Sequence, residues 1–106
     1  MATIFINAIS RGVGTTEVIN FTATEKSIVI GGNLSNLLTT SVPINLILRR
    51  GTTDTYLQKN KRIEAGDAFD VFKGTKLVLT AGDILVISSG LASSIDAVFS
   101  ILQGVA

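Results

Sequence analysis

Cysteine and histidine are both absent from this chain of 106 residues. Without cysteine there is no disulfide bond and no thiolate metal site, and without histidine the chain lacks the commonest general base and the commonest ligand of transition metals. We therefore expect no catalytic residue, no metal site and no cofactor, and we predict that the protein is not an enzyme. A Ser–Lys pair stays open as a nucleophile, but nothing in the sequence selects one.

Aromatic residues are also scarce, since the chain has no tryptophan and a single tyrosine, Tyr56. A free-standing binding module, for example one for carbohydrate, would stack sugar rings on exposed aromatic side chains, so this alternative is disfavoured. Acidic residues that could do acid–base work or bind calcium have no second catalytic group beside them and lie in no ligand-dense loop. We interpret these residues as parts of turns and strand edges: Glu64, Asp67, Asp70 and Asp83.

Charge is sparse, at 16% of residues against about 25% in a typical soluble domain. Nine basic and eight acidic residues leave a net charge of +1, which gives no drive toward nucleic acid or acidic membranes. No apolar run approaches the roughly 20 residues that span a bilayer, and no basic residue precedes the first apolar stretch, so we expect neither a membrane segment nor a secretory signal. With 46% hydrophobic residues, we expect a homo-oligomer that covers apolar surface.

Threonine, isoleucine and valine, which favour strands, supply 34 residues (12, 13 and 9). One domain of roughly nine or ten strands is predicted, in an all-β fold: an antiparallel β-sandwich of jelly-roll type. The segment Leu34–Ser41 is expected to be a loop with at most one helical turn. The expected strands are Ala2–Ile9, Glu17–Ala23, Ser27–Ile30 (closed by Gly31-Gly32-Asn33), Val42–Arg49, Thr55–Leu57, Lys61–Ile63, Ala68–Phe72, Leu77–Leu79, Ile84–Ser88 and Ile95–Leu102.

A short turn pattern occurs twice, 16 residues apart, as Ile63-Glu64-Ala65-Gly66-Asp67 and Leu79-Thr80-Ala81-Gly82-Asp83. Glycine adopts backbone angles that other residues resist, and aspartate can hydrogen-bond within its own turn. We therefore predict a tight turn between two strands at each copy, with positive φ at both glycines.

Alternation along the strands predicts the core. In Val42–Arg49 the residues Ile44, Leu46 and Leu48 share one face, and in Ile95–Leu102 the inward face is Ile95, Ala97, Phe99 and Ile101. The side chains that we expect to be buried between the two sheets are Leu46, Leu48, Leu79, Ile84, Val86 and Phe99.

The N-terminal run is apolar on both faces, with Ile4 and Ile6 on one and Phe5 on the other, and Arg11-Gly12-Val13-Gly14 follows it. A solvated edge strand should not be apolar on both faces. Residues 1–16 are therefore either an arm that pairs with another subunit or an ordinary first strand, and residues 17–106 form the sandwich. Ile4, Phe5 and Ile6 are candidate assembly contacts.

Two basic clusters are the remaining candidates. Nucleic-acid-binding surfaces interleave aromatic and basic residues, and only Tyr56 lies near these clusters, so nucleic acid is the least favoured partner. The other interpretations are a solvated rim and a charged contact with a partner protein. The candidate residues are Arg49 and Arg50, then Lys59, Lys61 and Arg62, together with Tyr56.

The two turn segments, with the second extended to Leu77-Val78-Leu79-Thr80-Ala81-Gly82-Asp83-Ile84-Leu85-Val86, also carry a resemblance. Through them, Asn20 to Gln103 resembles small structural proteins of tailed-phage particles, which decorate the head, form the neck or collar, or attach to the tail. The resemblance implies a non-enzymatic subunit of the virion, assembled in the host cytoplasm, that contacts other head, portal/neck or tail proteins. Its motif residues are turn and core residues, so it implies no active site.

Overall fold

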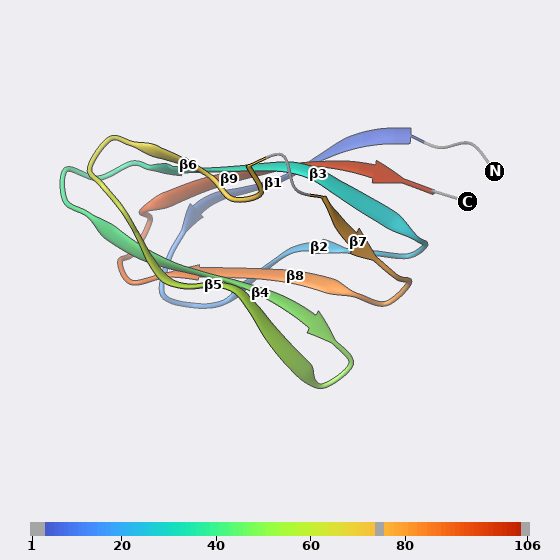
Figure 1. The fold of residues 1–106 in the computed structure, drawn as a ribbon. Coiled ribbons are helices and arrows are strands. Elements are labelled where there is room, and N and C mark those ends of the chain that lie inside the picture. The colour runs from blue at the N-terminus through green and yellow to red at the C-terminus, as the bar shows by residue number, and fades with distance from the viewer. Residues whose placement is uncertain (1–3, 74–75, 105–106) are drawn as a thin grey trace.

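The computed structural model describes residues 4–73 and 76–104, which form nine strands and no helix. The strands make two antiparallel sheets that face each other (Figure 1). The first sheet has the order β1-β9-β3-β6, with β7 also paired to β3, and the second has the order β2-β8-β4-β5. The bounds are β1 Ile4–Val13, β2 Val18–Thr22, β3 Ser27–Asn36, β4 Val42–Arg50, β5 Thr53–Ile63, β6 Ala68–Asp70, β7 Leu77–Leu79, β8 Ile84–Ser89 and β9 Ile95–Gln103.

The order of the strands is that of a jelly roll. The chain crosses between the sheets after β1, β2, β3, β5, β7 and β8, and every paired neighbour is antiparallel. β6 and β7 pair with opposite ends of β3, at Asn33–Ser35 and Ser27–Val29, so the two short strands share one position. Eight strand positions in two sheets are the jelly-roll arrangement, and the predicted fold class is confirmed. With no helix among the described residues, none of them forms a helix that could cross a membrane.

Phe99 on β9 lies at the centre of the core and is fully buried. Its ring meets that of Phe72 edge to face, with centroids 6.1 Å apart and planes at 70°. Gly32 on β3 lies directly opposite Phe99, and a Cβ atom there would be 2.7 Å from two ring carbons. The predicted inward face of β9 (Ile95, Ala97, Phe99 and Ile101) is fully buried.

The core prediction is correct for Leu46, Leu79 and Phe99 and wrong for Ile84; Val86 is buried as predicted, but not between the two sheets. Leu46 and Leu48 face the core and pair with Ile87 and Leu85, so β8 turns those two residues inward and directs Ile84 and Val86 to the outer face. Because β8 is apolar at every position from Ile84 to Ile87, alternation could not show which of its side chains face the core.

Leu48 is only half-buried, because the tip of the β4–β5 hairpin points away from the first sheet (Figure 1). Although Val86 faces outward, its side chain is only 1% exposed. It lies on the outer face of the second sheet beside Ile47, its partner on β4. The outer face of the second sheet therefore has an apolar centre of its own.

Several strand boundaries differ from those expected. β3 does not end at Gly31-Gly32-Asn33; it runs through to Asn36, with a register shift against β9 between Val29 and Gly31. β5 is one strand in place of the two short segments expected, and it absorbs an irregularity at Asn60, whose φ is 53° and whose N–H donates to Asn45 Oδ1 at 2.9 Å. The stretch after β3, 37–41, contains no helical turn.

β1, Ile4–Val13, pairs with β9 of its own chain. This arrangement is the second of the two alternatives for the N-terminal run, an ordinary first strand. The rest of the expected strand, Ala2 and Thr3, lies outside the described residues. Ile6 packs against the core, as an inward-facing residue of a sandwich strand does.

Candidate assembly surfaces

β1 forms one edge of the first sheet, and within the described residues it pairs with β9 alone. From Ile4 to Ser10 it carries no charged residue and no proline, and its seven residues match Gln103 to Ala97 one to one. The register shifts only beyond Ser10, before Val13. Natural edge strands are usually blunted by charge, proline or a bulge, and this stretch has none of the three.

Large apolar side chains of β1 lie at the surface. Phe5 is 75% exposed, Ile9 54% and Ile4 51%, whereas Ile6 lies against the core. Of the three predicted contacts on this strand, the structure therefore leaves Ile4 and Phe5 available. Ile9 is not among the predicted contacts. It lies on the same face of the strand as Phe5, and this shared face was the signal that could have found it.

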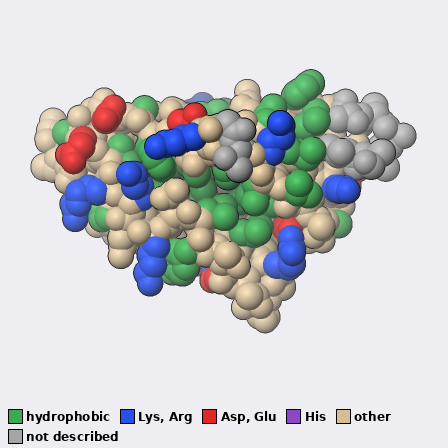
Figure 2. All heavy atoms as spheres, viewed as in Figure 1, with side chains coloured by type: hydrophobic (Ala, Val, Ile, Leu, Met, Phe, Trp, Pro, Cys, Tyr) green, Lys and Arg blue, Asp and Glu red, His purple; other side chains and the backbone are tan. Residues whose placement is uncertain are grey.

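The outer face of the first sheet carries an apolar row that crosses four strands. Phe5 pairs with Leu102, Leu102 with Ile28, and Ile28 with Val78. Phe5 and Val78 are 75% and 48% exposed, and the two middle residues are half-buried. Hydrophobic side chains gather in Figure 2 over the region where Figure 1 places β3 and β7. The row brings together residues from the two ends of the chain and from its middle.

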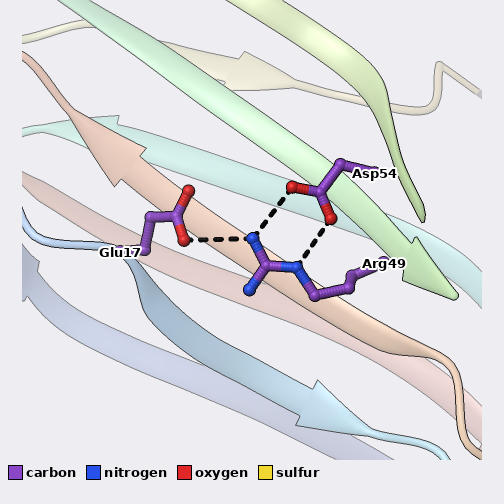
Figure 3. A network of polar contacts seen from close by, with 3 residues as sticks. All are labelled: Glu17, Arg49 and Asp54. Atoms are coloured by element: carbon purple, nitrogen blue, oxygen red, sulfur yellow. Dashed lines mark hydrogen bonds and ion pairs between the residues drawn. The ribbon is translucent and has the colours of Figure 1, made fainter. Parts of the chain in front are cut away.

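Arg49, a predicted contact, is held in an ion-pair network on the outer face of the second sheet (Figure 3). Its Nε and Nη2 donate to the two carboxylate oxygens of Asp54 at 2.6 and 2.9 Å, and Nη2 also donates to Glu17 Oε1 at 3.1 Å. The hydrogen bonds from Arg49 lower the pKa of Asp54 and raise that of the guanidinium. Since Glu17 precedes β2 and Asp54 lies on β5, the network spans the whole sheet.

Arg50 makes a second bidentate pair, from Nε to Asp83 Oδ1 at 2.9 Å and from Nη2 to Oδ2 at 2.7 Å. Asp83 also accepts hydrogen bonds from the N–H of Thr80 at 2.9 Å and from its hydroxyl at 3.2 Å. The bonds from Arg50 outweigh burial and lower the pKa of Asp83 to about 2. Both arginines of the first basic cluster are therefore engaged within the fold.

The second basic cluster lies along β5, the edge of the second sheet farthest from β2. Lys59 Nζ is 5.1 Å from the ring centroid of the half-exposed Tyr56, and Lys61 Nζ is 4.8 Å from that of Phe69. Arg62 donates from Nη1 to Ser41 Oγ at 3.1 Å. These residues form a charged rim, and the structure does not bring them together with the candidates on β1, which lie at an edge of the other sheet.

The described residues show no cluster of side chains suited to a metal ion. They contain no group of three or more acidic, histidine or cysteine side chains that could hold a metal ion. Ser89 and Ser94 are buried with their hydroxyl oxygens 2.7 Å apart, and each hydroxyl lies within hydrogen-bond distance of the carbonyls of Val13 and Leu91, to one of which it can donate at a time. An open hollow of about 280 Å³ under the β4–β5 hairpin is lined by Leu48, Arg50, Thr53 and Thr55.

Two asparagines have structural roles that the sequence pattern does not predict. Buried Asn36 donates from Nδ2 to the carbonyls of Thr40 and Ile63, both at 2.9 Å, and accepts the N–H of Leu38 at 2.8 Å. Asn20 on β2 donates to Ser10 Oγ at 2.9 Å, while its buried Oδ1 has no partner among the described residues. For Asn20 the signal was a polar amide inside an apolar strand, since asparagine is depleted in strands. Asn36 ends β3 in a stretch expected to be a loop, and the sequence carried no such signal there.

No protein-family model matches this chain, and no curated protein matches it. Among solved structures it is similar to a chain of Bacillus endospore appendages, described as a family of disulfide-linked pili, with TM-score 0.61, 13% identity, and 98% of this chain and 89% of that chain covered. It is also similar to a chain of the IBDV viral particle, with TM-score 0.58, 12% identity, and 96% and 31% covered. A pentameric capsid protein from metagenomic phage sequences matches at TM-score 0.48 and 19% identity, with 95% and 62% covered. At these identities the first two matches show a shared fold.

Proposed function

We propose that this chain is a non-enzymatic structural subunit of a bacteriophage particle, acting as a head decoration, neck/collar or tail accessory protein. It works by symmetric self-association and by docking on other virion proteins, and it is assembled in the host cytoplasm. The observation that carries the proposal is a jelly roll with an uncharged edge strand and an apolar row on one outer face. Exposed apolar surface of this kind marks interaction sites.

Two further observations support an assembly role. The fold is shared with a chain of an icosahedral viral particle and with a chain of bacterial pili. The two Ala-Gly-Asp segments that carry the resemblance to phage virion proteins both form tight turns at strand ends, with the Asp67 and Asp83 N–H groups donating to the carbonyls three residues earlier. Many weak contacts between copies of a rigid sandwich add up through multivalency.

The carbohydrate-binding alternative finds no platform in the described residues. Their exposed large aromatic side chains are Phe5 and Tyr56, and these lie on β1 and β5, at edges of different sheets. Two rings placed so cannot stack on one sugar.

Mass in solution tests the proposal. Sedimentation velocity and native mass spectrometry over a range of concentrations are expected to show oligomers, and co-sedimentation is expected to show binding to phage particles that lack this subunit. Elemental analysis is expected to find no stoichiometric zinc, iron or copper. A monomer at every concentration that binds no particle would contradict the proposal.

A further inference from the structure

The two long edge strands of the sandwich differ sharply in charge. β5, at the edge of the second sheet, carries Asp54, Lys59, Lys61 and Arg62. β1, at the edge of the first sheet, carries no charge from Ile4 to Ser10. Charged side chains on an edge keep other strands from pairing with it. The fold therefore protects the β5 edge and leaves the β1 edge open to another strand.

We infer that β1 pairs antiparallel with β1 of a second copy, about a two-fold axis through Asn7. This inference rests on the proposed function, because it names the surface through which the subunit self-associates. The pairing joins the first sheets of two copies into one continuous sheet and satisfies the backbone groups on the open side of β1. Two-fold interfaces use the same patch on both copies, which suits a strand that is its own partner.

The side chains of β1 select this register. With the axis at Asn7, Phe5 of one copy lies opposite Ile9 of the other, on the outer face, and each covers a side chain that is 75% or 54% exposed in the single chain. On the inner face Ile6 lies opposite Ala8, a large residue against a small one. Moving the axis by one residue, to Ile6 or to Ala8, would place Asn7 opposite Phe5 or Ile9 and leave the other large side chain unmatched.

β2 adds apolar surface on the same side of the sandwich. Asn20 of β2 reaches the carbonyl of Ala8 on β1 at 3.4 Å, so the two strands lie beside each other. Val18 and Ile19 of β2 are 37% and 59% exposed. The second copy would therefore meet apolar side chains from both sheets, at an edge where Arg11 is the first charged residue of β1.

A single cysteine tests the axis directly, because the chain has none of its own. Directly opposite residues of paired antiparallel strands lie close enough for a disulfide. Under mild oxidation Asn7→Cys is expected to form a covalent dimer. Asn33→Cys, an exposed position of β3 away from the edge, is the matched control and is expected to stay monomeric on a denaturing gel.

A charge swap tests the register. Phe5→Lys/Ile9→Lys places like charges opposite each other and is expected to raise the dimer dissociation constant at least about 100-fold, since such juxtaposition is strongly unfavourable. Phe5→Lys/Ile9→Glu places each lysine opposite a glutamate and is expected to keep the dimer at low salt and to weaken as salt screens the pairs. Thermal unfolding of both variants checks that these exposed substitutions leave the fold intact.

The outcomes separate this inference from the proposed function. Oligomers that persist in both charge variants, with no Asn7→Cys cross-link, would overturn the β1 pairing and leave the assembly role standing. Equal loss of the dimer in the two charge variants would overturn the register. A wild-type chain that is monomeric at every concentration and binds no phage particle would overturn both.

Discussion

Arg50 and Asp83, 33 residues apart in the chain, form a bidentate ion pair in which the carboxylate is 1% exposed and the guanidinium side chain 60% exposed. The pair joins the end of β4 to the turn before β8. The exposed Arg50 side chain therefore pairs with the buried carboxylate of Asp83, whose remaining hydrogen bonds come from Thr80 of its own turn.

This pair predicts a loss of stability in acid. The pKa of Asp83 falls from 3.8 to about 2 in the folded protein, chiefly through the hydrogen bonds from Arg50. Because the folded pKa lies below the unfolded one, the stabilisation is complete above about pH 4 and is lost as the pH falls toward 2, by about 2 kcal/mol. Urea unfolding between pH 2 and 7 measures it.

Asp83→Asn is expected to remove this part of the pH dependence. Asp67→Asn, at the matching but exposed position of the other turn, is the control and should keep it. Identical pH profiles for wild type and Asp83→Asn would contradict the assignment.

The positive φ predicted at both turn glycines is confirmed, at 69° for Gly66 and 95° for Gly82. No atom lies within 4 Å of a Cβ built at either, so alanine there would strain the backbone without a clash. Gly82→Ala and Gly66→Ala are each expected to destabilise the fold by about 1 kcal/mol or more in chemical denaturation. Gly31→Ala is the matched control, since Gly31 also has open space but no positive φ; an equal loss there would refute the backbone explanation.

Phe99→Ala is expected to lower the free energy of unfolding by about 3–5 kcal/mol, because it empties the centre of the core. A loss under about 1 kcal/mol would show that Phe99 contributes little to the core. Gly32→Ala is expected to cost about 1–3 kcal/mol, since its Cβ would meet the Phe99 ring at 2.7 Å. The two sites should be strongly non-additive: in a double-mutant cycle, Gly32→Ala should cost less when Phe99 is already Leu.

Asn36→Ala is expected to cost about 2–3 kcal/mol, because it leaves the Ile63 carbonyl without this donor and the Leu38 N–H without its acceptor. Asn33→Ala on the same strand is the control, since Asn33 is exposed and a surface change of this kind stays within about 0.5 kcal/mol. Similar losses for both, measured by urea unfolding, would contradict the structural role of Asn36.

Local pattern predicted much of this fold. The alternation of β4 and β9 gave the correct inward faces, and the two Ala-Gly-Asp segments gave the correct turns, because side-chain direction and turn geometry depend on neighbours in the chain. The sequence predicts β3 too short and divides β5 into two segments, because glycines and an irregularity at Asn60 look like strand ends until a paired neighbour carries the strand past them.

For the candidate surfaces, the sequence by itself determined that β1 is apolar on both faces and that charge is concentrated elsewhere. Tertiary structure decided which apolar residues stay exposed. It turned Ile6 into the core and left Phe5 at an open edge. It also engaged Arg49 and Arg50, which looked like free surface charges, in ion pairs.

The two aspartates of the repeated turn show most clearly what the sequence determines and what the tertiary structure decides. The sequence sets the same local turn at Asp67 and Asp83, since that geometry needs only the residues of the turn. Only the tertiary structure makes Asp83 a buried anion and leaves Asp67 exposed. At Asp83 the charge partner is Arg50, which approaches from another strand of the second sheet, and no pattern within the turn encodes so distant a partner.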